Sequence, residues 1–229
     1  MKINNRLNVL NKNLKIRISM TSWPVRINNV ATVFKTLLNN TLKADSYELT
    51  LSIEEFPNKE NDLPDDLKEL IKNNLICINW LKNDIRTFKK IIPIIKKYYP
   101  EEYLLIIVDD DILYNEDFIF NMVKNIKNNV IFCPINKNID YIISAFFILN
   151  TKIISDDFFR IDESFMKKFI DDTYISFYLK MIKKIPFNNK YLIVGKEFNS
   201  IKALSTTINY KEIGAEEWRV LYDMFFYNK

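Results

Sequence analysis

Short apolar runs alternate along this chain with segments whose apolar residues recur at helical spacing. The apolar runs predict strands at 14–20, 46–53, 75–80, 103–108 and 130–135. The segments between them predict helices at 26–40, 65–74, 87–100 and 115–128. Beyond residue 140 the order is less regular, with strands expected at 141–149 and 190–195 and a helix at 171–185. Such alternation favours an α/β fold in which helices cover both faces of a mostly parallel sheet.

Length and charge limit the kinds of protein this can be. The 229 residues suffice for one large α/β domain with a substantial core or for two small ones, and we expect a single domain over 1–229. Lysine and arginine exceed aspartate and glutamate by 33 − 29 = 4. That mild excess suits an anionic ligand or a membrane surface, but it is too small to indicate nucleic-acid binding.

Two residue types are almost or wholly missing. Histidine is absent, so acid–base chemistry must fall to carboxylates, lysine, tyrosine or cysteine. The only two glycines are Gly195 and Gly214, so the glycine-rich phosphate loops of dinucleotide-binding and P-loop proteins cannot form. Both of those nucleotide-binding classes are excluded.

The two cysteines and the chain's hydropathy indicate a compartment. Cys77 and Cys133 both lie inside apolar runs, and we expect buried thiols in strands rather than a disulfide, which fits a reducing cytosol. The chain contains no run of roughly 18 apolar residues, and its first fifteen residues lack the apolar centre of a signal peptide. We therefore expect a soluble, cytoplasmic protein.

Three loops should meet at one edge of the sheet, because ligands of open parallel sheets bind beyond the carboxyl ends of the strands. These loops are TSWPVR (21–26), WLKNDIRTFKK (80–90) and the acidic run DDD (109–111). Together they supply an aromatic side chain, several cations and a cluster of carboxylates. That set suits a nucleoside diphosphate with a metal ion.

The acidic run has the spacing of a metal-binding motif. On an extended segment the first and third side chains lie on the same side, so Asp109 and Asp111 can converge while Asp110 points away. Mn²⁺ or Mg²⁺ prefers oxygen ligands, often takes one or two carboxylates from protein, and fills its shell with water and phosphate. The alternatives are a solvated acidic loop or the N-cap of the next helix.

Four motifs carry a resemblance to a known family: ISMTSWPVRI, LTLSIEEFP, DIRTFKKIIPIIKKYYPEEYLLIIVDDDILY and FIDDTYISFYL. Over most of 16–179 the chain resembles bacterial glycosyltransferases of the GT-A (Rossmann-like) fold, related to family 2, that act in polysaccharide or lipopolysaccharide biosynthesis. The resemblance implies a nucleotide-sugar donor, most commonly a UDP-sugar, a manganese or magnesium ion on the D-x-D motif, and a glycan or lipid-linked acceptor. Residues 14–135 would form the nucleotide-sugar-binding half, and 136–229 the acceptor-binding half with a C-terminal helical segment.

The resemblance also assigns donor-binding residues. It implies a first nucleotide-binding loop, an aromatic, a carboxylate near the base or ribose, and cations near the diphosphate. These positions correspond to Thr21, Ser22, Trp23, Arg26, Asp84, Arg86, Lys89 and Lys90, with Asp109 and Asp110 of the acidic run beside them. Other readings stay open: the tryptophan could cover the sheet end, the three cations of 86–90 could be a solvated helix face, and the carboxylate could cap a helix starting near residue 87.

The acceptor side depends on the acidic pair Asp171 and Asp172. In relatives the second acid of this pair is usually the base, so the resemblance assigns Asp172 and implies inversion at the anomeric carbon. Two adjacent carboxylates raise one another's pKa, which suits general-base chemistry. The alternative is that one of them only caps the following helix.

Two features depart from the family pattern. Relatives often carry a late histidine on the metal and glycines near the catalytic loop, whereas this chain has no histidine and the stretch IDYIISAFFI in the loop region, so the third ligand would be water or phosphate. The C-terminal stretch GAEEWRVLYDMFFYNK is expected to pack on the core or a second copy, with peripheral contact to the inner face of the membrane as the alternative.

Rival functions are a catalytically silent nucleotide-binding protein of the same fold and a metal-dependent phosphotransferase or phosphohydrolase.

Overall fold

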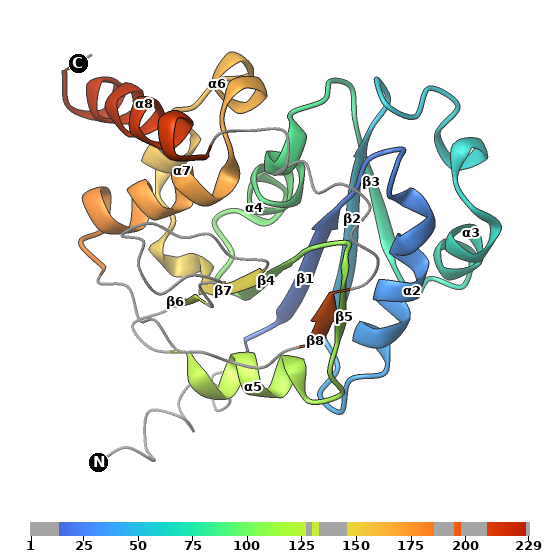
Figure 1. Ribbon diagram of the computed structural model, residues 1–229. Coiled ribbons are helices and arrows are strands. Elements are labelled where there is room, and N and C mark those ends of the chain that lie inside the picture. The colour runs from blue at the N-terminus through green and yellow to red at the C-terminus, as the bar shows by residue number, and fades with distance from the viewer. Residues whose placement is uncertain (1–13, 127–129, 133–145, 186–194, 198–209, 228–229) are drawn as a thin grey trace, which may run out of the picture.

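The computed structural model describes residues 14–126, 130–132, 146–185, 195–197 and 210–227. Its centre is a six-stranded sheet with the strand order β3-β2-β1-β4-β7-β6 (Figure 1). The strands are β1 (Ile16–Thr21), β2 (Ser46–Ser52), β3 (Cys77–Leu81), β4 (Leu104–Val108), β6 (Val130–Phe132) and β7 (Phe146–Asn150).

Strand directions confirm a mostly parallel sheet. Strands β3, β2, β1 and β4 run parallel to one another, whereas β7 is antiparallel to both β4 and β6. A separate two-stranded ribbon pairs β5 (Ile112–Tyr114) with β8 (Gly195–Glu197). The sequence did not predict β5, because three residues are too few to show a period. The predicted strands at 130–135, 141–149 and 190–195 lie partly outside the described residues.

Helices cover both faces of the sheet, as expected. One face packs against α2 (Ile27–Leu38), α3 (Asp65–Lys72) and α5 (Phe118–Asn125). The core on the other side is built with η2 (Arg86–Lys90), α4 (Ile92–Tyr98), α6 (Glu163–Lys168), α7 (Asp171–Phe177) and α8 (Tyr210–Tyr222) (Figure 1). Short helical turns complete the described chain: η1 (Lys59–Asp62), η3 (Thr151–Ile153), η4 (Asp156–Phe159), η5 (Tyr178–Ile182) and η7 (Asp223–Tyr227). The α/β fold class predicted from the sequence is confirmed.

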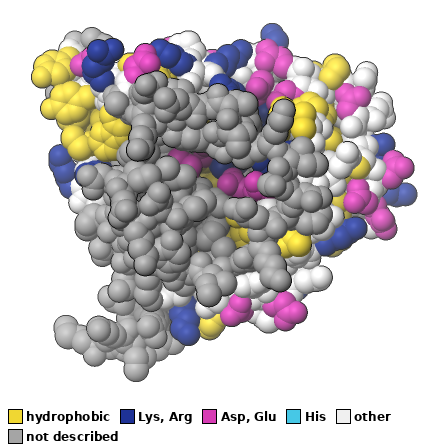
Figure 2. Space-filling view, in the orientation of Figure 1, with side chains coloured by type: hydrophobic (Ala, Val, Ile, Leu, Met, Phe, Trp, Pro, Cys, Tyr) yellow, Lys and Arg dark blue, Asp and Glu magenta, His cyan; other side chains and the backbone are white. Residues whose placement is uncertain are grey.

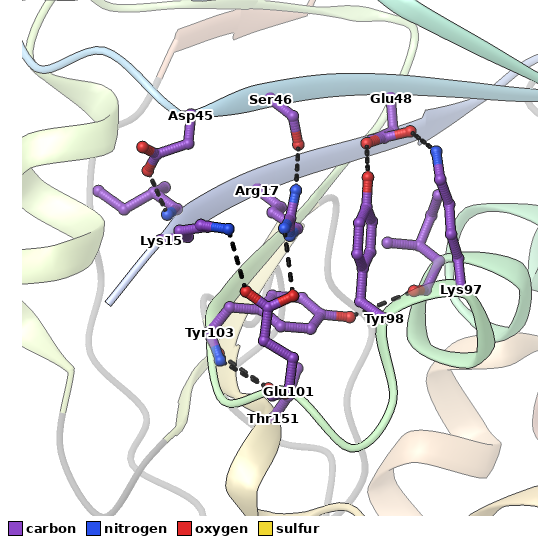
Figure 3. A network of polar contacts seen from close by, with 12 residues as sticks. Lys15, Arg17, Asp45, Ser46, Glu48, Lys97, Tyr98, Glu101, Tyr103 and Thr151 are labelled. Atoms are coloured by element: carbon purple, nitrogen blue, oxygen red, sulfur yellow. Dashed lines mark hydrogen bonds and ion pairs between the residues drawn. The ribbon is translucent and has the colours of Figure 1, made fainter. Parts of the chain in front are cut away.

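A buried polar network fastens α4 to the sheet near the amino ends of β1 and β2 (Figure 3). The carboxylate of Glu48 is fully buried and accepts hydrogen bonds from Tyr98 Oη at 2.7 Å, Asn79 Nδ2 at 2.9 Å and Lys97 Nζ at 3.1 Å. The guanidinium of Arg17 stacks 3.5 Å from the Tyr98 ring centre. Burial alone would raise the pKa of Glu48, but these donors hold it below its ordinary value.

Two local predictions need correction. The helix predicted over 87–100 is split into η2 and α4, because Pro93 has no backbone N–H and is tolerated only in the first turn of a helix, where α4 places it. Cys77 is exposed rather than buried, since β3 lies at the edge of the sheet. Cys133 lies outside the described residues. No helix within the described ranges is long and apolar enough to cross a membrane.

Candidate active site

The loop after β1 and the acidic run after β4 are joined directly. Ser22 Oγ donates a hydrogen bond of 2.6 Å to Asp110 Oδ2, and the Arg26 guanidinium, just before α2, pairs with Asp110 Oδ1. Arg26 also lies 2.9 Å from Asp111 Oδ2. At the end of β1, Thr21 Oγ1 donates to the Thr50 carbonyl at 2.7 Å and so ties β1 to β2. Two of the three loops expected at the carboxyl edge therefore contact each other, and the third joins them through Lys90 and Asp109.

Asp110 joins the acidic run to the loop after β1. Its side chain is buried, and each carboxyl oxygen already has a partner in Ser22 or Arg26. Burial raises its pKa, and Asp111 adds to that effect, while Arg26 and Ser22 oppose it. The contacts of Asp110 therefore hold Ser22 and Arg26 in place.

The expected D-x-D geometry holds only in part. Asp109 and Asp110 point to different partners, as alternation along an extended segment requires. Asp111, however, lies on a turn between β4 and β5 and shares Arg26 with Asp110. The strand ends at Val108, so strict alternation does not continue through the run.

Lys90 links the acidic run to the acidic pair of α7. Its Nζ lies 2.7 Å from Asp109 Oδ1 and 3.3 Å from Asp171 Oδ2, and the side chain is buried. Although burial lowers the pKa of Lys90, the carboxylates of Asp109, Asp171 and Asp172 raise it well above its ordinary value. The lysine is therefore a permanent positive charge between two groups of carboxylates.

Asp109 and Asp111 are the partly exposed carboxylates of the acidic run. Their side chains are 29% and 30% exposed, and Asp111 is close enough to raise the pKa of Asp109. Burial raises the pKa of Asp109 to about 6, with Asp111 adding to the shift and Lys90 opposing it. Within the described ranges no three acidic or thiol side chains form a metal-binding cluster. The residues fit an ion that takes two carboxylates and completes its shell with phosphate and water.

Lys89 has different partners from its neighbour. It is almost fully buried, lies 2.6 Å from Asp84 Oδ1, and pairs with Glu55. Asp84 also accepts from the backbone N–H of Arg86 at 2.9 Å, just before η2, whose N-cap residue is Ile85. Lys90, rather than Lys89, faces the aspartates.

Glu55 was missed at the sequence level. Its carboxylate accepts a 2.9 Å hydrogen bond from Ser52 Oγ and binds Lys89. Burial raises its pKa, with Asp84 adding to the shift and Lys89 opposing it. Its position in the motif LTLSIEEFP, just after β2 and at the same edge as the other loops, could have identified it as a site residue.

Two other residues predicted to bind the sugar donor, Arg86 and Trp23, form no hydrogen bond or ion pair with the acidic run in the described part of the chain. Arg86 has a positive φ of 53° and donates from Nη1 to the Lys167 carbonyl at 3.2 Å, so it reaches α6 and not the aspartates. Trp23 is half-buried beside Ser22. Its indole Nε1 is buried and has no hydrogen-bond partner among the described residues.

The acidic pair begins α7. Asp171 is its first helical residue, and the N-cap position belongs to Ile170, which makes no side-chain cap bond. Neither aspartate is therefore the N-cap residue. Asp171 is buried, whereas Asp172 is half-buried and thus the more accessible of the two.

Comparison with known proteins identifies the fold. No protein family and no curated protein matches this sequence. The mannosyltransferase PcManGT from Pyrobaculum calidifontis, solved with GDP-Man and Mn²⁺, is similar over 95% of this chain and 69% of its own, with 7% identity and a TM-score of 0.62. A 4-diphosphocytidyl-2C-methyl-D-erythritol synthase from Anaerococcus prevotii is similar over 95% of this chain and 99% of its own, with 12% identity and a TM-score of 0.51.

A third solved structure matches over less of its length. S. aureus TarS 1–349 is similar over 71% of this chain, with 12% identity and a TM-score of 0.43, and this chain spans 55% of it. The two stronger similarities cover nearly all of this chain, and the strand order agrees with a Rossmann-like sheet. The chain has the GT-A fold.

Proposed function

We propose that this protein transfers a sugar from a nucleotide-sugar donor to a hydroxyl group of a glycan or lipid-linked acceptor, in the synthesis of a bacterial cell-surface polysaccharide. One observation carries the proposal: Lys90 brings the acidic run (109–111) and the acidic pair (171–172) together at the carboxyl edge of the sheet. This edge is where open α/β sheets bind nucleotides. The fold neighbour PcManGT, with GDP-Man and Mn²⁺, supports it.

The donor would lie along the loops after β1 and β3. Trp23 offers a half-buried aromatic ring, and Asp84 offers a carboxylate that Lys89 holds in place. These groups suit a nucleoside, and UDP is the first nucleotide to test. Lys90 would face the departing diphosphate, where a fixed positive charge stabilises the developing negative charge.

A divalent ion would be held by Asp109 and Asp111. Mn²⁺ or Mg²⁺ supplies positive charge at the leaving diphosphate when bound. The chain's own contribution is to hold the two carboxylates near one another, through Lys90 on one side and Arg26 on the other.

Asp172 is the proposed general base. It is the more exposed carboxylate of the acidic pair, and Lys90 holds its neighbour Asp171 beside the acidic run. The base would remove the proton from the acceptor hydroxyl as its oxygen attacks the anomeric carbon. Attack on the face opposite the departing nucleotide inverts the configuration at that carbon.

The place of action is part of the proposal. We propose the cytoplasm, with a peripheral contact at the inner face of the membrane where a lipid-linked acceptor would be presented. Hydrophobic side chains gather at the C-terminal end of the described chain (upper left in Figure 2), and the exposed aromatic residues of α8 and η7 include Tyr222, Phe226 and Tyr227. Aromatic residues of this kind suit the membrane–water interface.

The test is calorimetric titration of UDP and GDP, each with Mn²⁺ and with EDTA. The proteins are wild type, the double variant Asp109→Asn/Asp111→Asn, and a control with the same charge change, Asp65→Asn/Asp66→Asn, on α3. We expect binding that requires both the metal and the two site aspartates, and that the control retains. Equal binding by both double variants, or no binding to wild type, would refute the donor site.

Two rival functions can be separated by product analysis. Nucleotidyl transfer is a candidate because this chain spans 99% of the diphosphocytidyl-methyl-erythritol synthase. It would release pyrophosphate from CTP in the presence of a sugar or polyol phosphate, whereas glycosyl transfer releases a nucleoside diphosphate. A catalytically silent protein would bind nucleotide without turnover, and Asp172→Asn would then change nothing measurable.

A further inference from the structure

A third buried carboxyl group lies beside the acidic pair, and it comes from the C-terminal helix. Glu217 of α8 has no exposed surface, and neither of its oxygens makes a hydrogen bond or salt bridge of ordinary geometry within the described residues. The Ile170 N–H and the Thr173 hydroxyl are nevertheless close enough to lower its pKa. Its neighbour Glu216, in contrast, is exposed and pairs with Lys168 at 2.7 Å.

The surroundings of Glu217 require it to be neutral. The charged groups that act on it are Asp171 and Asp172 of α7, which have the same sign. A buried carboxylate next to other carboxylates is strongly unfavourable and keeps its proton instead. Burial accordingly raises the pKa of Glu217 from 4.5 to about 9, with the two aspartates adding to the shift.

A neutral carboxyl group carries an O–H donor, and polar groups near Glu217 lack a hydrogen-bond partner. Asp171 Oδ2 is buried and makes no hydrogen bond in the described part of the chain, although Lys90 Nζ lies 3.3 Å away. The Thr173 hydroxyl is also buried without a partner of ordinary geometry there. Buried polar groups normally have hydrogen-bond partners. If the Thr173 hydroxyl donates to Glu217 and the protonated Glu217 donates to Asp171, each of the three side chains gains a partner.

We propose that Glu217 is a positioning residue for the acidic pair: its carboxyl group donates a hydrogen bond to Asp171, which holds Asp171 against Lys90 and leaves Asp172 turned toward the acceptor. The C-terminal helix α8 thereby becomes part of the acceptor-activating side of the site. This inference rests on the proposed function for its consequence in catalysis, but not for the arrangement of the carboxyl groups.

The first arm of the test measures the carboxyl groups directly. Carbon-13 NMR of labelled glutamate side chains follows the titration of Glu217 in wild type, in Asp171→Asn and in a remote control, Asp157→Asn. We expect a glutamate titrating at about 9 that disappears in Glu217→Gln, and whose pKa falls in Asp171→Asn but not in the control. A Glu217 that titrates in the ordinary range, or ignores Asp171, overturns the proposal regardless of any nucleotide.

The second arm measures catalysis, using UDP-glucose and GDP-mannose hydrolysis with Mn²⁺ as probes. Glu217→Ala should lower kcat by about tenfold to a hundredfold, because a misplaced base loses its alignment, while the nucleotide Kd stays unchanged. Glu217→Gln, which keeps a donor, should recover most of the loss, and Glu216→Gln is the control expected to behave as wild type. An unchanged kcat in Glu217→Ala overturns the inference. A fall in kcat that is accompanied by a comparable rise in the nucleotide Kd also overturns it. Absence of nucleotide binding in wild type instead refutes the proposed function.

The third arm uses stability. The unfolded chain loses the Glu217 proton above its ordinary pKa of 4.5, whereas the folded protein keeps it up to about 9. The stability associated with the protonated group is therefore complete below 4.5 and declines as pH rises toward 9. The Tm of Glu217→Gln relative to wild type should increase steadily from pH 5 to pH 9. A constant difference across that range contradicts a buried neutral Glu217.

Discussion

At the scale of single residues, Lys90 is the side chain on which the site depends most. It is buried, remains charged at every ordinary pH, and contacts one carboxylate from each side of the site. Lys89, one position earlier, is equally buried but neutralises Asp84 and Glu55 instead. Two adjacent lysines thus serve different parts of the same edge.

Removal of Lys90 should destabilise the fold in a pH-dependent way. Lys90→Met leaves Asp109 and Asp171 without their cation, and we expect a loss of about 2 kcal/mol at pH 8, less than for a wholly buried pair because Asp109 is partly exposed. At pH 5 the loss should shrink, because Asp109, whose pKa is about 6 in the intact site, is then protonated. Urea unfolding at both pH values measures this. Lys35→Met, at an exposed position of α2, should have no effect at either.

The titration of Asp109 also predicts the pH dependence of metal binding. A proton and a divalent ion compete for the same carboxylate, so Mn²⁺ affinity should fall as pH drops below about 6, the pKa of Asp109 without metal. Mn²⁺ titration by calorimetry between pH 5 and pH 7.5 tests this. Affinity that is constant across the range would show that Asp109 is not a ligand.

At the scale of elements, the segment η2–α4 decides how the site is supported. Its first turn carries both buried lysines, and its last turn carries Tyr98 and Lys97, which bind Glu48 at the opposite end of the sheet. Pro93 lies in the first turn of α4, where a helix tolerates proline. The network in Figure 3 therefore anchors the element that delivers Lys90.

Two adjacent tyrosines allow a matched test of that anchor. Tyr98→Phe removes a donor from the fully buried Glu48 carboxylate, and we expect a loss of about 1–2 kcal/mol in the free energy of unfolding. Tyr99→Phe removes a hydrogen bond to Asp156 at an exposed position and should cost close to nothing. Chemical denaturation distinguishes them. Equal losses would mean that the Glu48 network does not anchor α4.

At the scale of the whole molecule, the sheet separates two cores, and the helix that begins with the acidic pair packs in the second one. The C-terminal helix α8 and the turn η7 after it join that core, since Leu221 is fully buried and the Phe225 ring centre lies 5.6 Å from that of Phe177. The expectation that this segment packs on the core agrees with these contacts. Because Phe177 ends α7, the same packing holds the helix that begins with the acidic pair.

Two adjacent phenylalanines test the importance of this packing. Phe225→Ala should cost about 3 kcal/mol, because it leaves a cavity against α7, whereas Phe226→Ala, at a side chain 41% exposed, should cost far less. Thermal and urea unfolding measure both. If the two variants were equally stable, the C-terminal helix would not be an integral part of the second core.

Much of the fold was predictable because it follows local rules. Alternating apolar periodicity reports which segments are strands and which are helices, and it located most described elements to within a few residues. It could not show that β7 runs antiparallel, or that β5 forms a separate ribbon, because pairing depends on contacts between distant segments.

The sequence by itself determined that carboxylates, cations and an aromatic side chain would follow parallel strands, since the carboxyl ends of such strands share one edge. Only the tertiary structure decided which partners they take. Lys89 and Lys90 are indistinguishable in sequence, yet backbone geometry directs them to different carboxylates. Glu217 lies forty-five residues beyond Asp172, in a helix with no motif. The free energy of burying a charge depends on what surrounds it in space, and no local pattern contains that information.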